Sequence, residues 1–191
     1  IINPASNTKL MGIYKSQNYL CSQCEPEGFR RITWYVDRPD NMAAWSVSIE
    51  GDKDLFPILL SNGNKIESKN LSNNRHKVIF NDPFNKPSYL FALVAGDFDC
   101  LHQNYVTKTS NKKIDLYIYT NKGEISKAGY AMESLKRAIE WDEKTFGLEY
   151  DLNLFSIVAV RDFNFGAMEN KSLNIFNEVY VLANPNLATD M

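Results

Sequence analysis

The sequence predicts a mainly β protein whose second part is mixed α and β. Short runs rich in β-branched and aromatic residues recur through the first half, with polar turn residues between them. One stretch of helical periodicity follows, flanked by further apolar runs. Hydrophobic residues make up 44% of the 191 residues, which is enough for a substantial core.

Five strands are expected in the first part. The run 29–36 is rich in aromatic and β-branched residues, and 45–49 alternates apolar and polar side chains as a half-buried strand does. The other three are 56–60, 76–80 and 89–95. Turn signals separate the strands, at 37–40, 51–52, 62–64 and 81–83. Strands at this spacing predict a sandwich or a layered sheet.

The pattern changes after Gly96-Asp97, which we take as a domain boundary. Residues 103–109 and 113–119 are expected to form a hairpin that turns at Ser110-Asn111. A helix should follow, because one helical stripe is apolar: Ala128, Met132, Leu135, Ile139 and Phe146. Gly147 is placed to end it. Two more strands are expected, at 152–160 and 173–182.

Composition excludes several classes of function. With 21 basic and 23 acidic residues the net charge is −2, so there is no basic stripe for a nucleic acid. No apolar run reaches the ~20 residues of a membrane helix. The N-terminus lacks the basic region of a signal peptide, so we expect a cytoplasmic protein. Because the chain does not begin with Met, we also expect both ends to be cuts through a longer protein.

Three cysteines, Cys21, Cys24 and Cys100, argue against a disulfide scaffold and favour a reducing compartment. Together with His102 they have the residue types of a four-ligand zinc site, although structural zinc sites usually close with two short-spaced pairs. Three buried or half-buried thiols are the preferred interpretation. Both His76 and His102 are expected to be surface or core-edge residues rather than ligands.

Two segments carry carboxylates in short loops next to strands. The first is Gly166-Ala167-Met168-Glu169-Asn170, between two apolar runs. The second is the Gly- and Pro-containing loop 23–29, with Gln23, Glu25 and Glu27. Either segment alone could be an ordinary polar turn.

Together these segments resemble the M1 family of zinc aminopeptidases, and the resemblance covers almost the whole chain. It is carried by residues 18–33, 37–40, 59–64, 89–97, 146–151 and 166–171. It implies that residues 1–97 are the latter part of an N-terminal β-sandwich or saddle domain. Residues 98–191 would be the truncated, β-rich start of a thermolysin-like catalytic domain.

The resemblance also implies a substrate site for peptides with a free N-terminus. By this resemblance, the substrate amine is bound by Gln23, Glu25 and Glu169. The strand that pairs with the substrate main chain comprises Gly166, Ala167, Met168 and Asn170. Phe165 would line the pocket for the first side chain. The chemistry fits, because two carboxylates match a protonated amine and Gln23 can accept one more N–H. Small residues at the start of the motif let a substrate backbone approach.

The family's zinc motif, His-Glu-x-x-His, is missing from this sequence, which has two histidines in all. A metal-activated water needs three protein ligands and a base. The resemblance therefore implies zinc in the intact enzyme, with no metal and no catalytic residue in this chain, which we expect to be inactive alone. The missing helical part of the catalytic domain should leave one apolar face of the second half uncovered, and we expect that face to favour self-association.

Two other readings stay open. The chain could be a non-catalytic module that binds peptide N-termini through the same carboxylates. It could also be a structural β protein without a site, in which case both acidic loops are coincidental.

Overall fold

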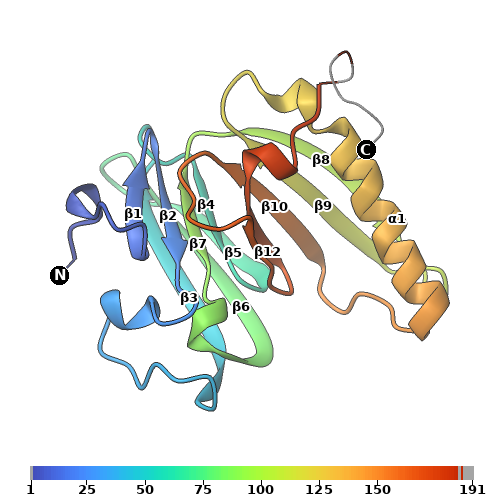
Figure 1. Ribbon diagram of the computed structural model, residues 1–191, viewed down its shortest axis with the longest axis horizontal. Coiled ribbons are helices and arrows are strands. Elements are labelled where there is room, and N and C mark those ends of the chain that lie inside the picture. The colour runs from blue at the N-terminus through green and yellow to red at the C-terminus, as the bar shows by residue number, and fades with distance from the viewer. Residues whose placement is uncertain (1, 185, 187–191) are drawn as a thin grey trace.

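The computed structural model describes residues 2–184 and 186. It contains three β-sheets and, among these residues, one α-helix, so the prediction of a mainly β chain with a mixed second part is confirmed. In Figure 1 the sheets of the first half lie beside a larger sheet, and α1 covers that sheet's far face. No described helix is both long and apolar enough to cross a membrane.

The first half forms two antiparallel sheets. One has the order β1-β2-β7-β4 and is built from Gly12–Ser16, Tyr19–Gln23, Leu93–Gly96 and Ile58–Ser61. The other has the order β3-β6-β5 and is built from Met42–Asp52, Arg75–Pro87 and Asn64–Asn70. Three short 3-10 helices accompany them: η1 (Pro4–Ser6), η2 (Phe29–Arg31) and η3 (Ser88–Leu90).

The second half forms a five-stranded mixed sheet of order β11-β12-β10-β9-β8. Its strands are Ala167–Met168, Leu173–Asn177, Leu154–Val160, Lys113–Thr120 and Asp99–Val106. β10 runs parallel to β9 and β12, and the two outer pairs are antiparallel. Helix α1 (Gly129–Phe146) ends at Gly147, whose φ of 66° is left-handed, as predicted. Two 3-10 helices, η4 (Ile125–Lys127) and η5 (Glu178–Tyr180), complete this half.

The predicted strand at 29–36 is wrong. Phe29–Arg31 is a 3-10 helix and the following residues form a loop. The aromatic residues that suggested a strand instead build a cluster, in which the Phe29 ring lies 5.1 Å from Tyr35, 5.2 Å from Trp45 and 5.2 Å from Phe91. These edge-to-face contacts satisfy the aromatic content without a sheet.

Other predicted strands are shifted. The run 89–95 starts as η3, and its strand begins at Leu93. The run 173–182 ends as a strand at Asn177, because the Asn177 side chain accepts the N–H of Val179 and starts a 3-10 turn. β6 continues to Pro87, past the break expected at 81–83. Strands β1, β2 and β5 were not predicted. Cys21 and Cys24 are buried, but Cys100 is exposed, contrary to expectation.

One hydrophobic core crosses from the first half to the second. It joins side chains of the β1-β2-β7-β4 sheet, such as Tyr14 and Val94, to Val158 and Val160 of β10. The alternate β10 residues, Ile157 and Ala159, face α1 in a second core. Apart from Ser156, β10 is thus apolar, because both of its faces are covered.

Candidate functional site

The 166–170 motif forms the outer edge of the five-stranded sheet. Its strand β11 pairs with β12 so that Ala167 lies opposite Phe176 and Met168 opposite Ile175. The Asn177 N–H donates to the Gly166 carbonyl at 2.9 Å. Since alternate residues of an antiparallel strand face the partner, the N–H and C=O of Ala167 point away from β12. Among the described residues no strand pairs with that outer edge.

The motif alternates between inward and outward side chains. Met168 is 1% exposed and packs in the core that joins the halves, and Asn170 is also buried. Glu169, between them, is exposed. Phe165 is 46% exposed just before the motif. The buried side chains of Met168 and Asn170 therefore fix the strand so that the Glu169 carboxylate points outward.

Asn170 uses its side chain to shape the chain after Glu169. Its Oδ1 accepts the N–H of Ser172 at 2.9 Å and of Leu173 at 2.8 Å. Its Nδ2 lies 3.5 Å from the carbonyl oxygen of Leu90, in the first half. The Asn170 amide is thus occupied by the chain itself, and it holds Glu169 in place instead of facing solvent.

The second predicted segment is a tight turn directly after β2. The Gly28 N–H donates to the Cys24 carbonyl at 2.6 Å. A Cβ on Gly28 would lie 2.3 Å from the Gln23 carbonyl oxygen, so the turn requires glycine. Glu25 and Glu27 lie on the exposed side of this turn.

Gln23 is the last residue of β2 and is only 1% exposed. Its Nε2 donates to the Glu25 carbonyl at 3.4 Å. Its Oε1 is buried with no hydrogen-bond partner among the described residues. A buried acceptor without a donor is costly, so an N–H that reached this oxygen would bind it favourably.

The structure brings the two segments to a common neighbour, η3. Glu25 lines a pocket of about 320 Å³ together with Tyr89 of η3. The next residue, Leu90, is the one that Asn170 reaches. Glu25 and the neighbour of Glu169, Asn170, therefore both lie next to the same short helix.

Asp37 supports the Glu25 side of this arrangement. Burial pushes the pKa of its carboxyl up, but hydrogen bonds from Ser88 and from the backbone and side chain of Arg30 outweigh burial and lower the pKa. Asp37 thus stays charged and ties η3 to η2. Sequence reasoning took Asp37 for part of a turn and did not select Tyr89 or Ser88, because these contacts join residues far apart in the sequence.

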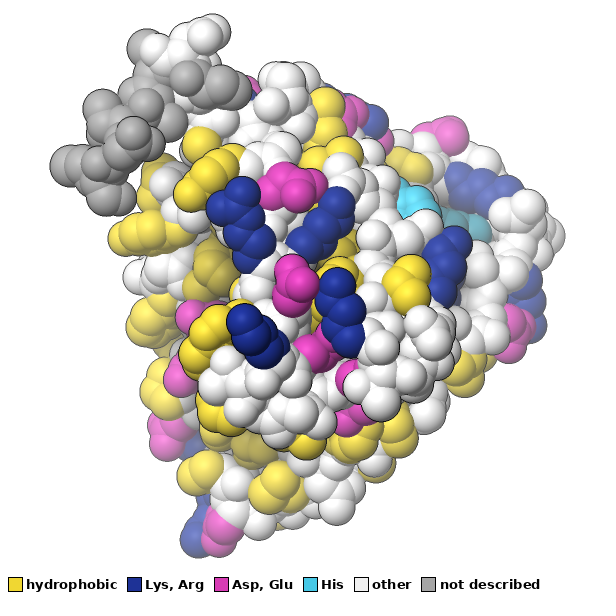
Figure 2. Space-filling model, turned by 90° about the vertical axis from the view of Figure 1, so that its right-hand side faces the viewer, with side chains coloured by type: hydrophobic (Ala, Val, Ile, Leu, Met, Phe, Trp, Pro, Cys, Tyr) yellow, Lys and Arg dark blue, Asp and Glu magenta, His cyan; other side chains and the backbone are white. Residues whose placement is uncertain are grey.

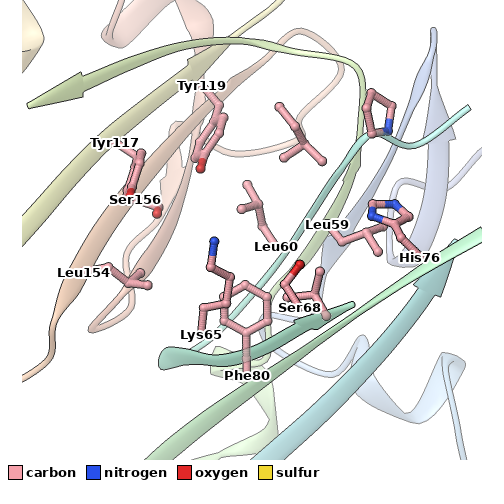
Figure 3. Close-up of a pocket in the computed structure, with 13 residues that line it drawn as sticks. Leu59, Leu60, Lys65, Ser68, His76, Phe80, Tyr117, Tyr119, Leu154 and Ser156 are labelled. Atoms are coloured by element: carbon pink, nitrogen blue, oxygen red, sulfur yellow. The ribbon is translucent and has the colours of Figure 1, made fainter. Parts of the chain in front are cut away.

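A separate cavity of about 210 Å³ lies between the sheets of the two halves, and none of the predicted site residues lines it. Figure 3 shows the Lys65 amino group pointing into it from β5, opposite the hydroxyl groups of Tyr119 and Ser156. His76 lies at its edge, half-buried, with Nε2 2.7 Å from the Phe56 carbonyl oxygen. His102 is exposed on β8, so both histidines lie where we expected them.

The side that carries α1 mixes charged and hydrophobic side chains (Figure 2). Four large hydrophobic residues on or just after α1 are strongly exposed: Tyr130, Trp141, Phe146 and Leu148, at 57–70%.

Among the described residues no three His, Cys, Asp or Glu side chains come together as metal ligands. The side chains of this part of the chain thus do not form a zinc site.

In the described part of the chain, layered β-sheets with one α-helix and an exposed carboxylate next to an unpaired strand edge define a β-rich chain with a candidate site for an extended peptide. Family comparison agrees, because the Peptidase M1 N-terminal domain matches residues 2–90 and the Peptidase family M1 domain matches residues 130–191. The chain therefore belongs to the M1 family of peptidases, which are hydrolases.

Individual relatives are similar over nearly the whole chain. Aminopeptidase N of Haemophilus influenzae is 57% identical over 98% of this chain and 21% of its own length. Aminopeptidase N of Escherichia coli is 54% identical over 99% of this chain and 22% of its own length. The crystal structure of Legionella pneumophila aminopeptidase A in complex with aspartic acid superposes with a TM-score of 0.91 at 39% identity, covering 96% of this chain and 22% of that one. The chain thus spans about a fifth of the length of these relatives.

Proposed function

We propose that this chain forms the amine-recognising part of a zinc aminopeptidase that removes N-terminal residues from peptides. The observation that carries the proposal is the exposed Glu169 beside the outward-facing peptide groups of Ala167, on a strand edge with which no described strand pairs. An extended peptide can pair with such an edge through its main chain. The carboxylate then meets the charged amine that distinguishes a chain end from an internal peptide bond.

In this proposal the second segment completes the site. Glu25 supplies a second carboxylate from the turn after β2, and Gln23 Oε1 accepts an N–H of the substrate amine. Support comes from the exposure of Glu25 and from the missing donor at Gln23. Holding the amine fixes the distance to the first peptide bond, so that one residue is removed at a time.

The remaining motif residues have supporting roles in the proposal. Met168 and Asn170 anchor the strand from inside, and Gly166 keeps its start free of a side chain. Phe165, half exposed before the strand, borders the pocket for the first side chain of the substrate. Its ring would keep that pocket apolar.

We place the division between the two domains at about residue 97. In support, every described strand of the five-stranded sheet starts at Asp99 or later, and the other two sheets end by Gly96. A cytoplasmic location is the companion proposal, supported by three free cysteines with no disulfide among them. Zinc would belong to the complete gene product.

Calorimetry with a dipeptide and its N-acetylated twin tests the proposal. We expect the chain to bind the free-amine dipeptide about tenfold more tightly or better, because a charge-assisted contact is lost on acetylation. Glu169→Gln should remove most of this preference. The control is Glu133→Gln, which changes an exposed carboxylate on α1 and should leave binding unchanged. Equal binding of both dipeptides would contradict the proposal.

A fluorogenic aminoacyl substrate tests the division of labour. The 191-residue chain should show no turnover, whereas the complete gene product should bind zinc and release amino acids. Turnover by the chain itself with stoichiometric zinc would overturn this view. Free-amine binding without any turnover in the complete product would point to the non-catalytic peptide-binding alternative.

Self-association is a further part of the proposal. Tyr130, Trp141, Phe146 and Leu148 give the α1 side an apolar surface, and such surfaces tend to bury themselves against another molecule. We expect dimers or larger species in light scattering at high concentration. Trp141→Lys should shift the chain toward monomer, and a monodisperse wild-type monomer would count against the idea.

A further inference from the structure

A buried set of side-chain hydrogen bonds joins the two halves next to the motif. Asn62, in the turn after β4, donates from Nδ2 to the Leu90 carbonyl at 3.0 Å and accepts the Ala92 N–H on Oδ1 at 2.7 Å. Its neighbour Gly63 donates its N–H to Ser172 Oγ at 2.6 Å. Asn62 is 2% exposed and Ser172 0%. The turn at 62–63 thus bonds both to the η3 segment and to the residues that follow the motif.

The Leu90 carbonyl is the point where these bonds meet. It accepts a hydrogen bond from Nδ2 of Asn62, which belongs to the first half. Nδ2 of Asn170, which belongs to the second half, lies 3.5 Å from the same oxygen. Tyr89, one residue earlier, lines the pocket of Glu25. Glu169, one residue before Asn170, carries the outward carboxylate. Both carboxylate-bearing segments therefore lie next to η3.

The backbone at this point leaves little freedom. Gly63 has φ +87°, and a Cβ there would lie 2.3 Å from the Asn81 carbonyl oxygen, so β6 packs directly on the turn. Ser61 Oγ also donates to the Ala92 carbonyl at 2.8 Å. The Asn62 side chain is thus bonded to the Leu90 carbonyl of η3 from a turn that has little room to move.

We infer that Asn62 is a positioning residue of the amine site: it sets the spacing between the Glu25 turn and the Glu169 strand by holding η3 and, through Gly63 and Ser172, the end of the motif. This inference rests on the proposed function. Asn62 touches no substrate itself, and it acts through the two segments that do.

The test compares Asn62→Ala with a matched asparagine variant in the full chain. Asn7 also makes two side-chain bonds to backbone carbonyls, from Nδ2 to Met11 at 2.7 Å and to Ile13 at 2.9 Å, and its Oδ1 accepts the Lys9 N–H; these bonds stay within residues 7–13, away from η3 and the motif. Both alanine variants should lower the melting temperature. Below that temperature, calorimetry with the free-amine dipeptide and its N-acetylated twin measures the preference for a free amine.

We expect Asn62→Ala to reduce that preference about tenfold, because small displacements of binding groups are costly, whereas Asn7→Ala should retain it. Ser172→Ala removes the acceptor of the Gly63 N–H with little change in volume and should reduce the preference in the same direction. It serves as the second variant if Asn62→Ala fails to fold.

The outcomes separate the two hypotheses. If the wild-type chain shows no free-amine preference, the proposed function fails and this inference with it. If the wild type shows the preference and both Asn62→Ala and Ser172→Ala keep it, the positioning role alone is wrong. A loss of preference in Asn7→Ala as large as in Asn62→Ala would reduce the effect to general destabilisation and would also overturn the inference.

Discussion

At the scale of single residues, the neighbours of a side chain decide what it can do. Glu169 is an exposed carboxylate because Met168 and Asn170 on either side are anchored in the interior. Gln23 is the opposite case, a buried amide whose Oε1 finds no donor among the described residues. A charged amine could pair with the Glu169 carboxylate and also donate an N–H to the Gln23 oxygen, because an ammonium group has three donors.

Gly28 gives a direct test of the turn that carries Glu25. In Gly28→Ala the new Cβ would meet the Gln23 carbonyl oxygen at 2.3 Å and the Cys24 Cα at 2.7 Å, both backbone atoms that cannot move aside. We expect a loss of about 2 kcal/mol in the free energy of unfolding, measured by urea denaturation. Gly129→Ala is the control, because nothing lies within 4 Å of its Cβ. Unchanged stability of Gly28→Ala would show that the turn is looser than described.

The three thiols should differ in reactivity. Burial raises the pKa of Cys21 to about 12, and burial also raises that of Cys24. Desolvation raises the pKa of Cys100 too, but Cys100 is exposed on β8, so a reagent can reach it. At mildly alkaline pH a chromogenic disulfide reagent should therefore modify one thiol in the native chain and all three in denaturant, since the thiolate is the reactive form. Cys100→Ser should abolish the native reaction, and rapid modification of more than one thiol would contradict the burial of the other two.

At the scale of elements, short strands depend on the contacts at their ends. β11 has two residues, and it is held by the Asn177 bond before it and the Asn170 turn after it. The β8–β9 hairpin is held in a similar way by Glu149, which follows α1. Glu149 accepts hydrogen bonds from the Ser110 hydroxyl and from the backbone N–H groups of Thr109 and Ser110.

This clamp predicts a pH dependence. The side-chain hydrogen bond from Ser110, with the two backbone N–H groups, lowers the pKa of Glu149 from 4.5 to about 2. A lowered folded-state pKa means that Glu149 stabilises the fold above about pH 4.5 and loses this contribution as the pH falls toward 2. The difference in urea midpoint between wild type and Glu149→Gln should thus shrink over that interval. A difference that stays constant from neutral pH to pH 2 would contradict the clamp.

The strength of the local pattern decided which elements could be predicted. The helical stripe that ends at Gly147 and the hairpin strand at 113–119 were clear in the sequence, because their apolar positions repeat with the right period. β1 and β2 were missed because they are five residues long and bury polar residues such as Ser16 and Gln23. The run 29–36 misled because aromatic clusters and strands use the same residues.

The candidate site was accessible from the sequence only in part. The 166–170 motif and the loop 23–29 are continuous segments, so a family resemblance can pick them out. Asn62 and Tyr89 could not be selected in this way, because they matter through contacts with residues such as Leu90 and Ser172 that lie far away in the chain. Long-range hydrogen bonds leave no periodic trace in the sequence.

At the scale of the whole molecule, the two halves share their interior. Tyr14 of β1 is fully buried and donates from its hydroxyl to the Asp162 carbonyl at 2.7 Å, across the boundary. The Arg161 N–H donates to the Tyr19 hydroxyl at 3.0 Å in the same region. Since β10 packs against the first half on one face and against α1 on the other, the largest core crosses the boundary near residue 97, and smaller clusters lie within each half.

A shared core predicts that the two halves unfold together. In a Trp34→Phe, Trp141→Phe variant, fluorescence reports on Trp45 in the aromatic cluster of the first half, and the helical circular-dichroism signal reports on α1 in the second. We expect both probes to give the same urea midpoint, as in a cooperative transition. Val158→Ala, which opens a void where β10 meets the first half, should lower both midpoints equally, by a free energy of about 2 kcal/mol. Two separate transitions, or a Val158→Ala shift seen by one probe alone, would mean that the two halves unfold independently. The boundary near residue 97 would then separate two cooperative units as well as two sets of sheets. The spacing of the proposed amine site would then no longer be fixed by the packing of the two halves.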